Sequence, residues 1–394
     1  MPSLIAAGAR DAQSLVTRIY DVKDEIALLD ANRYPLIGLL TNAGKDLVRK
    51  KGAPIKKAVT DDPEFKVFED SYLPRVFTGE STVDPDGGNL TLAANGTKLL
   101  PGDVILVTSQ GWRFQIVSIT SDTVVVVGAE LGGATGSAAT AVGTVLKIGN
   151  ANQEGADIRA IKRTDPTPSS GYTQIFRNSA GATRTELNTK TYIKLRDHDY
   201  QLQKVAIEHM QDIERSFWFS KLAKTNGVAG TSGTIRYTEG VINKIQTNRS
   251  ANIDTEAEFY SALRAQGFKY GQKEKYAFCG GNFMDMIDSW YRNKLQVFQG
   301  DDTYGILLNK LRTGAGVVNL IHNEIFDEVD QYSNYCVMVD MSTMLYRFLE
   351  KSDTKLLTNR QGNGEDGQID EYLTECGLYM ENEKNDAIFS KGAL

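Results

Sequence analysis

Cysteine and long apolar runs are scarce in this chain of 394 residues. Its three cysteines, Cys279, Cys336 and Cys376, lie far apart and are odd in number, which predicts ordinary thiols of a reducing compartment and no disulfide framework. No run of about eighteen apolar residues occurs, so no membrane-spanning helix is expected. Residues 1–16 also lack the basic start and the long apolar centre of a signal peptide.

Motifs for catalysis and metal binding are lacking as well. The three histidines, His198, His209 and His322, have no second ligand at a useful spacing, and His209 is expected to be a polar or capping neighbour in a helix. No Cys-x-x-Cys pair and no Gly-x-Ser-x-Gly elbow occurs. The letters of residues 362–367, GNGEDG, match a dinucleotide fingerprint, but strand-like residues follow instead of a helix, which predicts a loop or hairpin turn. The sequence therefore predicts no enzyme, no cofactor and no metal.

Charge is present but unevenly distributed. The whole chain has 44 basic and 50 acidic residues, a net charge of −6, whereas a dedicated nucleic-acid-binding domain is usually basic. Residues 1–60 hold ten basic and six acidic side chains, a balance of +4. Residues 320–394 hold six basic and fifteen acidic ones, a balance of −9. One end of the chain is therefore basic and the other acidic.

The basic excess near the start is concentrated in the segment GKDLVRKKGAPIKK. Its basic side chains are Lys45, Arg49, Lys50, Lys51, Lys56 and Lys57. One interpretation is a solvated charge run. A second is a nucleic-acid patch, although no aromatic residues are interleaved to stack on bases. A third is contact between the basic head of one copy and the acidic tail of another, within a homo-oligomer.

Strand-like patterns begin at about residue 63. Short β-branched runs between turn residues cover residues 90–150 and predict a small barrel or sandwich. The following segment, RTDPTPSSGYTQIFRNS at residues 163–179, is extended, polar and proline-containing, yet it ends in an apolar and aromatic run. The question it raises is what that run contacts.

Residues 198–225 give the most regular helical pattern. Its apolar stripe is Leu202, Ala206, Met210, Ile213 and Phe217. Asp197 is expected as the N-cap and Asn226 with Gly227 as the stop. At the usual rise per residue such a helix is about 42 Å long, which indicates a structural spine.

Mixed patterns follow this helix. Further helices are expected at residues 255–266 and 282–298, and strands at KYAFCGG, GVVNLIHNEIF and NYCVMVDM. Residues 370–394 alternate like a pair of strands and close the chain, which we expect to return to the spine helix.

Several segments, in this order and spacing, carry a resemblance that covers nearly the whole chain. They are IYDVKDEIALLDANRYPLIGLL, PGDVILV, VGTVLKIGNANQEGAD, YTQIFRNS, DHDYQLQKVAIEHMQDIERSFWFSK and YLTECGLYMENEKNDAIFSKG. Together they resemble a tailed-phage major capsid protein of the Hong Kong 97-type (HK97-like) fold. The resemblance implies an α+β fold with an N-terminal arm, a long E-loop carrying a small β insertion, a spine-helix P domain and an α/β A domain. The implied boundaries are 1–62 for the N-terminal arm, 63–196 for the E-loop with its β insertion at about 90–150, 197–232 for the spine helix, 233–349 for the A domain and 350–394 for the C-terminal strands returning to the P domain.

The resemblance also implies a function. The chain would self-assemble into hexamers and pentamers of an icosahedral shell around double-stranded DNA, which it would not bind sequence-specifically. It would be located in the virion capsid after assembly in the host cytoplasm, with no membrane. Other partners would be separate scaffold and portal proteins, with a decoration protein as an open further partner. Alternative interpretations are a virion decoration or tail/adhesin protein that binds through its β module, and a hydrolase with an unrecognised site.

As part of an E-loop, residues 163–179 would be the returning limb of an arm that lies across a neighbouring subunit. Tyr172, Ile175 and Phe176 would then join the six basic residues as intersubunit contacts. Alternatively, this apolar trio closes the subunit's own core. Residues 1–18, which precede the family-like IYDVKDEI, are too few for a coiled-coil scaffold, so we expect a separate scaffold protein and no removable leading segment.

Overall fold

The structure is a computed structural model. It describes residues 35–37, 56–80, 82–134, 140–155, 157–189, 197–226, 233–291 and 309–393. The chain forms two compact units: residues 68–169 are the inserted unit, and residues 1–67 with 170–394 are the core unit. The chain passes between them through two strands that pair with each other, β2 (Glu64–Glu69) and β11 (Thr167–Tyr172). None of the described helices is long and apolar enough to cross a membrane.

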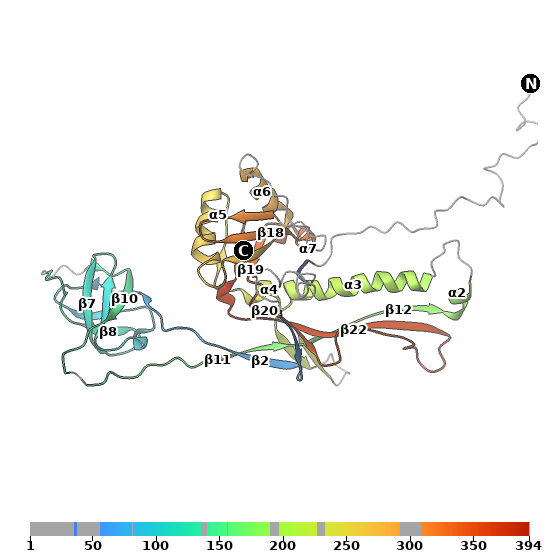
Figure 1. Cartoon of the computed structure of the whole chain (residues 1–394), viewed down its shortest axis with the longest axis horizontal. Helices are drawn as coiled ribbons and strands as arrows, with labels where there is room; N and C mark the ends of the chain where they lie inside the picture. Colours follow the sequence, from blue (N-terminus) through green and yellow to red (C-terminus); the bar gives the residue numbers. More distant parts are fainter. Residues whose placement is uncertain are drawn as a thin grey trace, which may run out of the picture. The chain divides into compact units, whose positions relative to one another are not determined.

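The first sheet of the core unit joins strands that are far apart in the sequence. Its order is β1-β20-β22-β12, and β21 also pairs with β22. The strands are β1 (Lys56–Thr60), β12 (Gln174–Thr183), β20 (Met344–Leu349), β21 (Lys355–Leu357) and β22 (Gly367–Met380). β12 and β22 are antiparallel from the Gln174–Cys376 pair to the Thr183–Gly367 pair. Figure 1 shows the long helix α3 (Asp197–Phe219) lying along these two strands.

Helix α3 is held on this sheet by its apolar stripe and by buried polar contacts. Ile213 and Phe217 are buried, as the helical spacing predicts. His209 Nδ1 lies 2.7 Å from Asn178 Oδ1, and His209 Nε2 lies 2.7 Å from Thr374 Oγ1. Burial lowers the pKa of His209, so the neutral ring joins the helix to both β12 and β22.

The helix ends at Phe219, and the expectation that it continues to Thr225 is wrong. Asn243 Nδ2 donates to the carbonyl oxygens of Phe219 and Ser220, each at 2.9 Å, so the last carbonyls of the helix have a partner without a further turn. The strands that follow and pair with each other are β13 (Ala223–Asn226) and β14 (Thr234–Tyr237). With 23 residues the helix is about 34 Å long.

The second sheet of the core unit is mixed, with the order β15-β23-β19-β16-β18-β17. Its strands are β15 (Arg249–Ser250), β16 (Glu274–Cys279), β17 (Asn309–Arg312), β18 (Val317–His322), β19 (Tyr335–Val339) and β23 (Ala387–Ser390). Helices α5 (Glu256–Ala262) and α6 (Gly281–Tyr291) share a buried apolar cluster with these strands. The helix expected at 282–298 thus begins at Gly281 and is described as far as Tyr291.

Two details of this region differ from the expectation. The letters NEIF do not extend β18, because α7 (Glu324–Asp327) begins there and Asn323 Oδ1 accepts the N–H of Ile325 at 3.2 Å. The last two strands of the chain do not pair with each other: β22 lies in the first sheet, whereas β23 pairs with β19 in the second. The expected return of the C-terminal strands to the spine helix stays a prediction for β23, whose Ile388 belongs to the same apolar cluster as Ile213 and Phe217 of α3.

The inserted unit is a small β structure with its own core. Its main sheet has the order β3-β10-β6-β7-β8-β5, and β4 pairs with β9. The strands are β3 (Val76–Thr78), β4 (Thr82–Val83), β5 (Gly88–Thr91), β6 (Asp103–Val107), β7 (Trp112–Ile119), β8 (Val124–Val127), β9 (Thr140–Ala141) and β10 (Thr144–Asn150). The expected insertion at 90–150 is too narrow, because β3 pairs with β10 and Phe77 is buried in the same core.

Candidate functional site

Two limbs connect β2 and β11 to the sheet of the inserted unit. The outgoing limb is residues 70–75 and the returning limb is residues 157–166, and neither forms a helix or a strand. Thr164 Oγ1 of the returning limb donates to Asp70 Oδ2 of the outgoing limb at 3.2 Å. Three apolar side chains on the limbs are almost wholly exposed: Tyr72 at 99%, Ile158 at 98% and Ile161 at 91%. Two adjoining segments therefore carry an exposed apolar surface.

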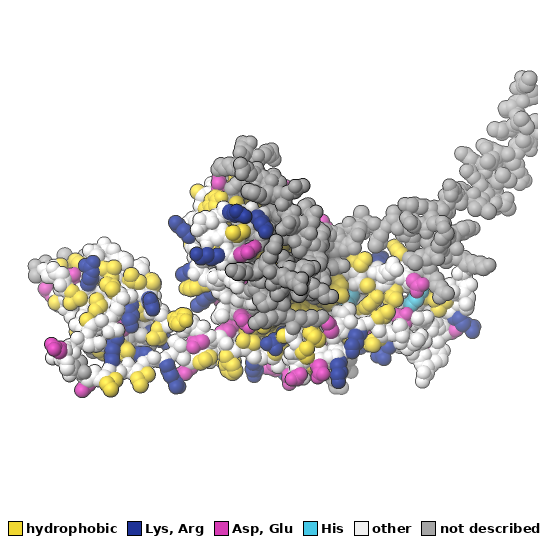
Figure 2. Space-filling view, in the orientation of Figure 1, with side chains coloured by type: hydrophobic (Ala, Val, Ile, Leu, Met, Phe, Trp, Pro, Cys, Tyr) yellow, Lys and Arg dark blue, Asp and Glu magenta, His cyan; other side chains and the backbone are white. Residues whose placement is uncertain are grey.

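A groove of about 640 Å³ lies between the limbs and strand β10. It is lined by Tyr72, Leu73, Pro74, Arg75, Lys147, Ile148, Gly149, Asn150, Lys162, Arg163 and Thr164. Of its basic residues, Lys147 and Arg163 form ion pairs within the inserted unit. Arg75 and Lys162 have no ion-pair partner in the part of the chain that the structure describes. The groove therefore combines apolar walls with uncompensated positive charge, and Figure 2 shows basic and hydrophobic side chains interspersed over this unit.

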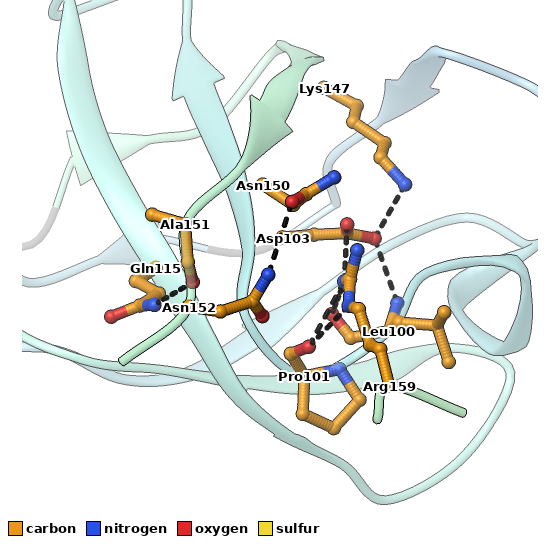
Figure 3. Close-up of polar contacts among 9 residues, drawn as sticks. All are labelled: Leu100, Pro101, Asp103, Gln115, Lys147, Asn150, Ala151, Asn152 and Arg159. Atoms are coloured by element: carbon orange, nitrogen blue, oxygen red, sulfur yellow. Dashed lines mark hydrogen bonds and ion pairs between the residues drawn. The ribbon is translucent and has the colours of Figure 1, made fainter. Parts of the chain in front are cut away.

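A buried carboxylate fixes the start of the returning limb to the sheet (Figure 3). Asp103, which has no exposed surface, accepts from Lys147 Nζ and from Arg159 Nη2, each at 2.6 Å, and from the backbone N–H of Leu100 at 2.8 Å. Arg159 also donates to the carbonyl oxygen of Pro101 at 3.0 Å. Burial alone would raise the pKa of Asp103, but the hydrogen bonds from Lys147 and Arg159 outweigh it and lower the pKa. Because Arg159 is held in this way, the neighbouring Ile158 is presented on a fixed backbone.

The chain after β10 also lies very close to the backbone of Gly102, in the turn before β6. Gly102 has a φ of +83°, and a Cβ there would lie 3.0 Å from Asn152 Oδ1 and 3.2 Å from the carbonyl oxygen of Ala151. Gln115 Nε2 donates to the same carbonyl of Ala151 at 2.8 Å. A glycine at position 102 therefore lets the returning chain lie directly on the turn before β6.

The predicted basic contacts lie mostly outside the described residues. Lys45, Arg49, Lys50 and Lys51 are not among them. Lys56 and Lys57 belong to β1, where their backbones pair in parallel with Leu345 and Tyr346 of β20. Their contact with a neighbouring copy stays a prediction.

The three predicted apolar contacts, Tyr172, Ile175 and Phe176, do not all lie on one face, because successive side chains of a strand point to opposite faces. Phe176 is 6% exposed and packs in the core unit's own apolar cluster, with its ring centroid 6.5 Å from that of His209. For Phe176 the alternative of closing the subunit's own core is therefore correct. Ile175, on the opposite face of β12, is 56% exposed, and Tyr172 at the end of β11 is half-buried. Ile175 and Tyr172 remain candidate contacts.

The histidines have structural partners. His198 Nε2 lies 3.0 Å from Asp370 Oδ2, and His322 Nε2 lies 2.6 Å from Asp327 Oδ2. Within the described residues, no group of three or more potential metal-ligand side chains comes together. Residues 362–367 form a turn, in which the Glu365 N–H donates to the carbonyl oxygen of Gly362 at 3.1 Å, as the sequence predicted.

The limb residues were missed at the level of sequence. Ile158 and Ile161 stand in GADIRAIKR, where large aliphatic residues are spaced by three among basic ones without a continuing helical or alternating pattern. An apolar residue in a segment that fits neither period has no local element to bury it. Large apolar residues in a segment without helical or strand periodicity are therefore the sequence feature that indicates exposed apolar side chains at Ile158 and Ile161.

The comparison with protein families identifies the class as viral major capsid proteins. The matching family is described as SU10 major capsid protein, and its model matches residues 8–392. The chain therefore belongs to the SU10 major capsid protein family. The prediction of a major capsid protein with an α+β fold is confirmed: the protein is a subunit of the virion capsid and forms a homo-oligomeric shell. The HK97-like form of that fold and the icosahedral geometry of the shell stay predictions.

Solved structures from two phages and an encapsulin are similar at low identity. The capsid of Myoviridae phage XM1 is 10% identical, with a TM-score of 0.46 over 96% of this chain and 98% of that one. Microbacterium phage Oxtober96 is 10% identical, with a TM-score of 0.45 over 96% and 98% of the two chains. An encapsulin from Synechococcus elongatus is 8% identical, with a TM-score of 0.41 over 58% and 78%. No curated protein matches the chain. The family match alone carries the assignment.

Proposed function

We propose that the inserted unit and its two limbs form an E-loop arm that lies across a neighbouring subunit of the shell. The exposure of Tyr72, Ile158 and Ile161 is the observation that carries this proposal. Covering one such side chain is worth about 1.5–3 kcal/mol. A symmetric shell repeats the same contact in every equivalent subunit, so modest contacts add up to a closed particle.

The groove supports the same role. Arg75 and Lys162 place positive charge beside apolar walls, which suits acidic and apolar side chains of a second copy. The balance of −9 over residues 320–394 supplies acidic groups in every copy. Ile175 is a further exposed contact on the core unit.

The wider assembly is part of this proposal. The shell consists of hexamers and pentamers around double-stranded DNA and assembles in the host cytoplasm with separate scaffold and portal proteins. The net charge of −6 supports packaging without tight binding of the DNA. Of the boundaries implied by the resemblance, those of the N-terminal arm at 1–62, the E-loop at 63–196, the A domain at 233–349 and the C-terminal strands at 350–394 belong to the proposal as well.

The test replaces Ile158 and Ile161 by Gln in the full chain. Both side chains are exposed in the single subunit, so its unfolding midpoint should not change, whereas the yield of closed shells should fall at least tenfold by sedimentation and electron microscopy. Val117→Gln with Leu131→Gln is the matched control, because these residues are 59% and 57% exposed in the same unit but lie outside the limbs. Normal shell yield from the limb variant would remove the limbs from the interface.

A further inference from the structure

A carboxylate of the spine helix, without exposed surface, holds a segment from far away in the sequence. Glu214 Oε1 accepts the backbone N–H of Leu36 at 2.9 Å, and Oε2 accepts that of Ile37 at 2.7 Å. Oε1 also accepts the indole N–H of Trp218, one turn further along α3, at 2.9 Å. The carboxylate has thus exchanged water for three N–H donors. Two of them come from residues 35–37, which we call the arm segment.

The arm segment matches this acceptor because its two donors are consecutive. Pro35, which precedes them, is buried and has no N–H. Residues 35–37 therefore offer two backbone donors, which together with the indole N–H of Trp218 make up the three that the carboxylate accepts. The fixed φ of proline also reduces the conformational freedom that the free segment would lose on docking.

Apolar contacts complete the site that receives the arm segment. We call this site, formed by Glu214, Trp218 and the apolar cluster around them, the notch. Leu36 is 0% and Ile37 is 5% exposed, and both belong to the apolar cluster of the core unit. The ring of Trp218 lies edge-to-face against Phe278 and Phe326, with ring centroids 4.9 Å apart in both pairs. The apolar cluster that the segment joins is therefore built in part by α3, β16 and α7, which come much later in the chain than residues 35–37.

We propose that Glu214 and Trp218 form a docking site for residues 35–37 that recognises two consecutive backbone N–H groups. Attachment of the N-terminal arm is then a reversible step, separate from folding of the core unit. Detachment removes two of the three donors of a buried carboxylate at once, so the site favours full docking over partial contact. The occupant is this chain's own segment, and the recognition is of the backbone, with Leu36 and Ile37 filling the apolar part of the notch.

Hydrogen exchange of the full chain, measured by mass spectrometry, tests the site. The amides of Leu36 and Ile37 should exchange at least tenfold more slowly than in an unstructured peptide. Glu214→Gln places an NH₂ group where a donor is now accepted, so protection of these two amides should fall at least tenfold while exchange in β16 stays unchanged. Glu208→Gln is the matched control, because Glu208 lies on the same helix with its side chain half exposed. This control should change neither the protection of the Leu36 and Ile37 amides nor the exchange in β16.

A backbone substitution separates the N–H group from the side chain. Replacing the amide of residue 37 by an ester, with the hydroxy-acid analogue of isoleucine, removes one donor and keeps the side chain. Loss of protection at Leu36, with exchange elsewhere unchanged, would support the proposal. Leu36 remaining protected in both changed proteins would show that apolar contacts alone hold the segment, and exposure of the whole core unit would show that the segment is inseparable from the fold. Either result overturns the proposal.

Discussion

The inserted unit and the core unit bury different kinds of residue. Among the described residues, Asp103 is the only polar side chain buried in the inserted unit, whereas the core unit buries many, His209, Glu214 and Lys275 among them. The inserted unit is built largely from strands that are neighbours along the chain, such as β6, β7 and β8. The first sheet of the core unit instead pairs β1 with β20 and β12 with β22.

This difference has a physical reason. Segments that are hundreds of residues apart must meet in one register, and a slipped register would leave buried polar groups without partners, at a cost of about 1–3 kcal/mol each. Buried polar contacts therefore specify the long-range pairing of the core unit. The inserted unit has mostly local contacts, so an apolar core with correct turns is enough.

The largest expected effect tests whether the two units fold independently. Phe114→Ala truncates a fully buried ring of the inserted unit and should destabilise it by about 3–5 kcal/mol. Phe217→Ala is the counterpart in the core unit. Differential scanning calorimetry should show two transitions, with each variant moving a different one. A single transition that both variants shift would contradict the comparison.

The second prediction concerns the pH dependence of the core unit. Burial raises the pKa of Glu214 to about 7, although its three N–H donors act to lower it. Because the pKa is higher in the folded state, the stabilisation is complete below about pH 4.5 and is lost as the pH rises to about 7. The loss in the free energy of unfolding is about 3 kcal/mol.

Urea unfolding at pH 5 and pH 8 measures this loss. Glu214→Gln cannot titrate, so its difference between the two pH values should be smaller than that of the unsubstituted chain by about the same 3 kcal/mol. Burial raises the pKa of Asp386 as well, which leaves a slope of the same sign in both proteins. Equal slopes in the two proteins would mean that Glu214 does not titrate as expected.

The third prediction gives the inserted unit the opposite response to pH. The pKa of Asp103 is lowered, because the hydrogen bonds from Lys147 and Arg159 outweigh its burial. Its stabilisation is therefore present above the ordinary pKa of a carboxyl group and is lost as the pH falls through the lowered value. Asp103→Asn should cost the inserted unit about 2 kcal/mol at pH 7, and the cost should decrease as the pH falls below the ordinary pKa of a carboxyl group. Calorimetry of the inserted-unit transition along a series of pH values measures this, and a cost that increases toward acid pH would argue against the charged pair.

The smallest effect per contact is expected from the basic head. Reversing Lys45, Arg49, Lys50 and Lys51 to Glu should leave the subunit folded but lower the shell yield, since exposed ion pairs are worth about 0.2–1 kcal/mol each and recur in every subunit. The yield from the unsubstituted chain should also fall with salt. The control reverses exposed lysines elsewhere: Lys98, Lys221, Lys351 and Lys355. If both sets of reversals lower the yield equally, the effect is one of net charge and not of this segment.

Local patterns predicted much of the fold. The stripe ending in Ile213 and Phe217 gave the buried face of α3, and β-branched runs between turns gave the strands of the inserted unit. The end of α3 was not predictable, because Asn243, which binds its last carbonyls, lies 23 residues beyond Ser220. Alternation placed Ile175 and Phe176 on opposite faces but could not say which face is covered.

The docking site of the arm was beyond the reach of sequence patterns. A glutamate in the middle of a helix has the same local signature whether it faces water or a buried notch. Its partners at Leu36 and Ile37 are 178 and 177 residues away and contribute backbone atoms, which have no residue type to recognise. Only the three-dimensional arrangement brings them together.

The pairing of β2 with β11 has a consequence for protein engineering. The chain leaves the core unit after Val67 and re-enters it at Ser170, so both crossing points lie within one two-stranded ladder. Gly171 fixes this ladder, because a Cβ at that position would collide with the ring of Phe65. Neighbouring strands are about 5 Å apart, so a guest domain with closely spaced termini can be fused at these two points in place of residues 68–169. We expect the β2–β11 ladder to accept different guest domains as fusions without loss of the core unit's fold.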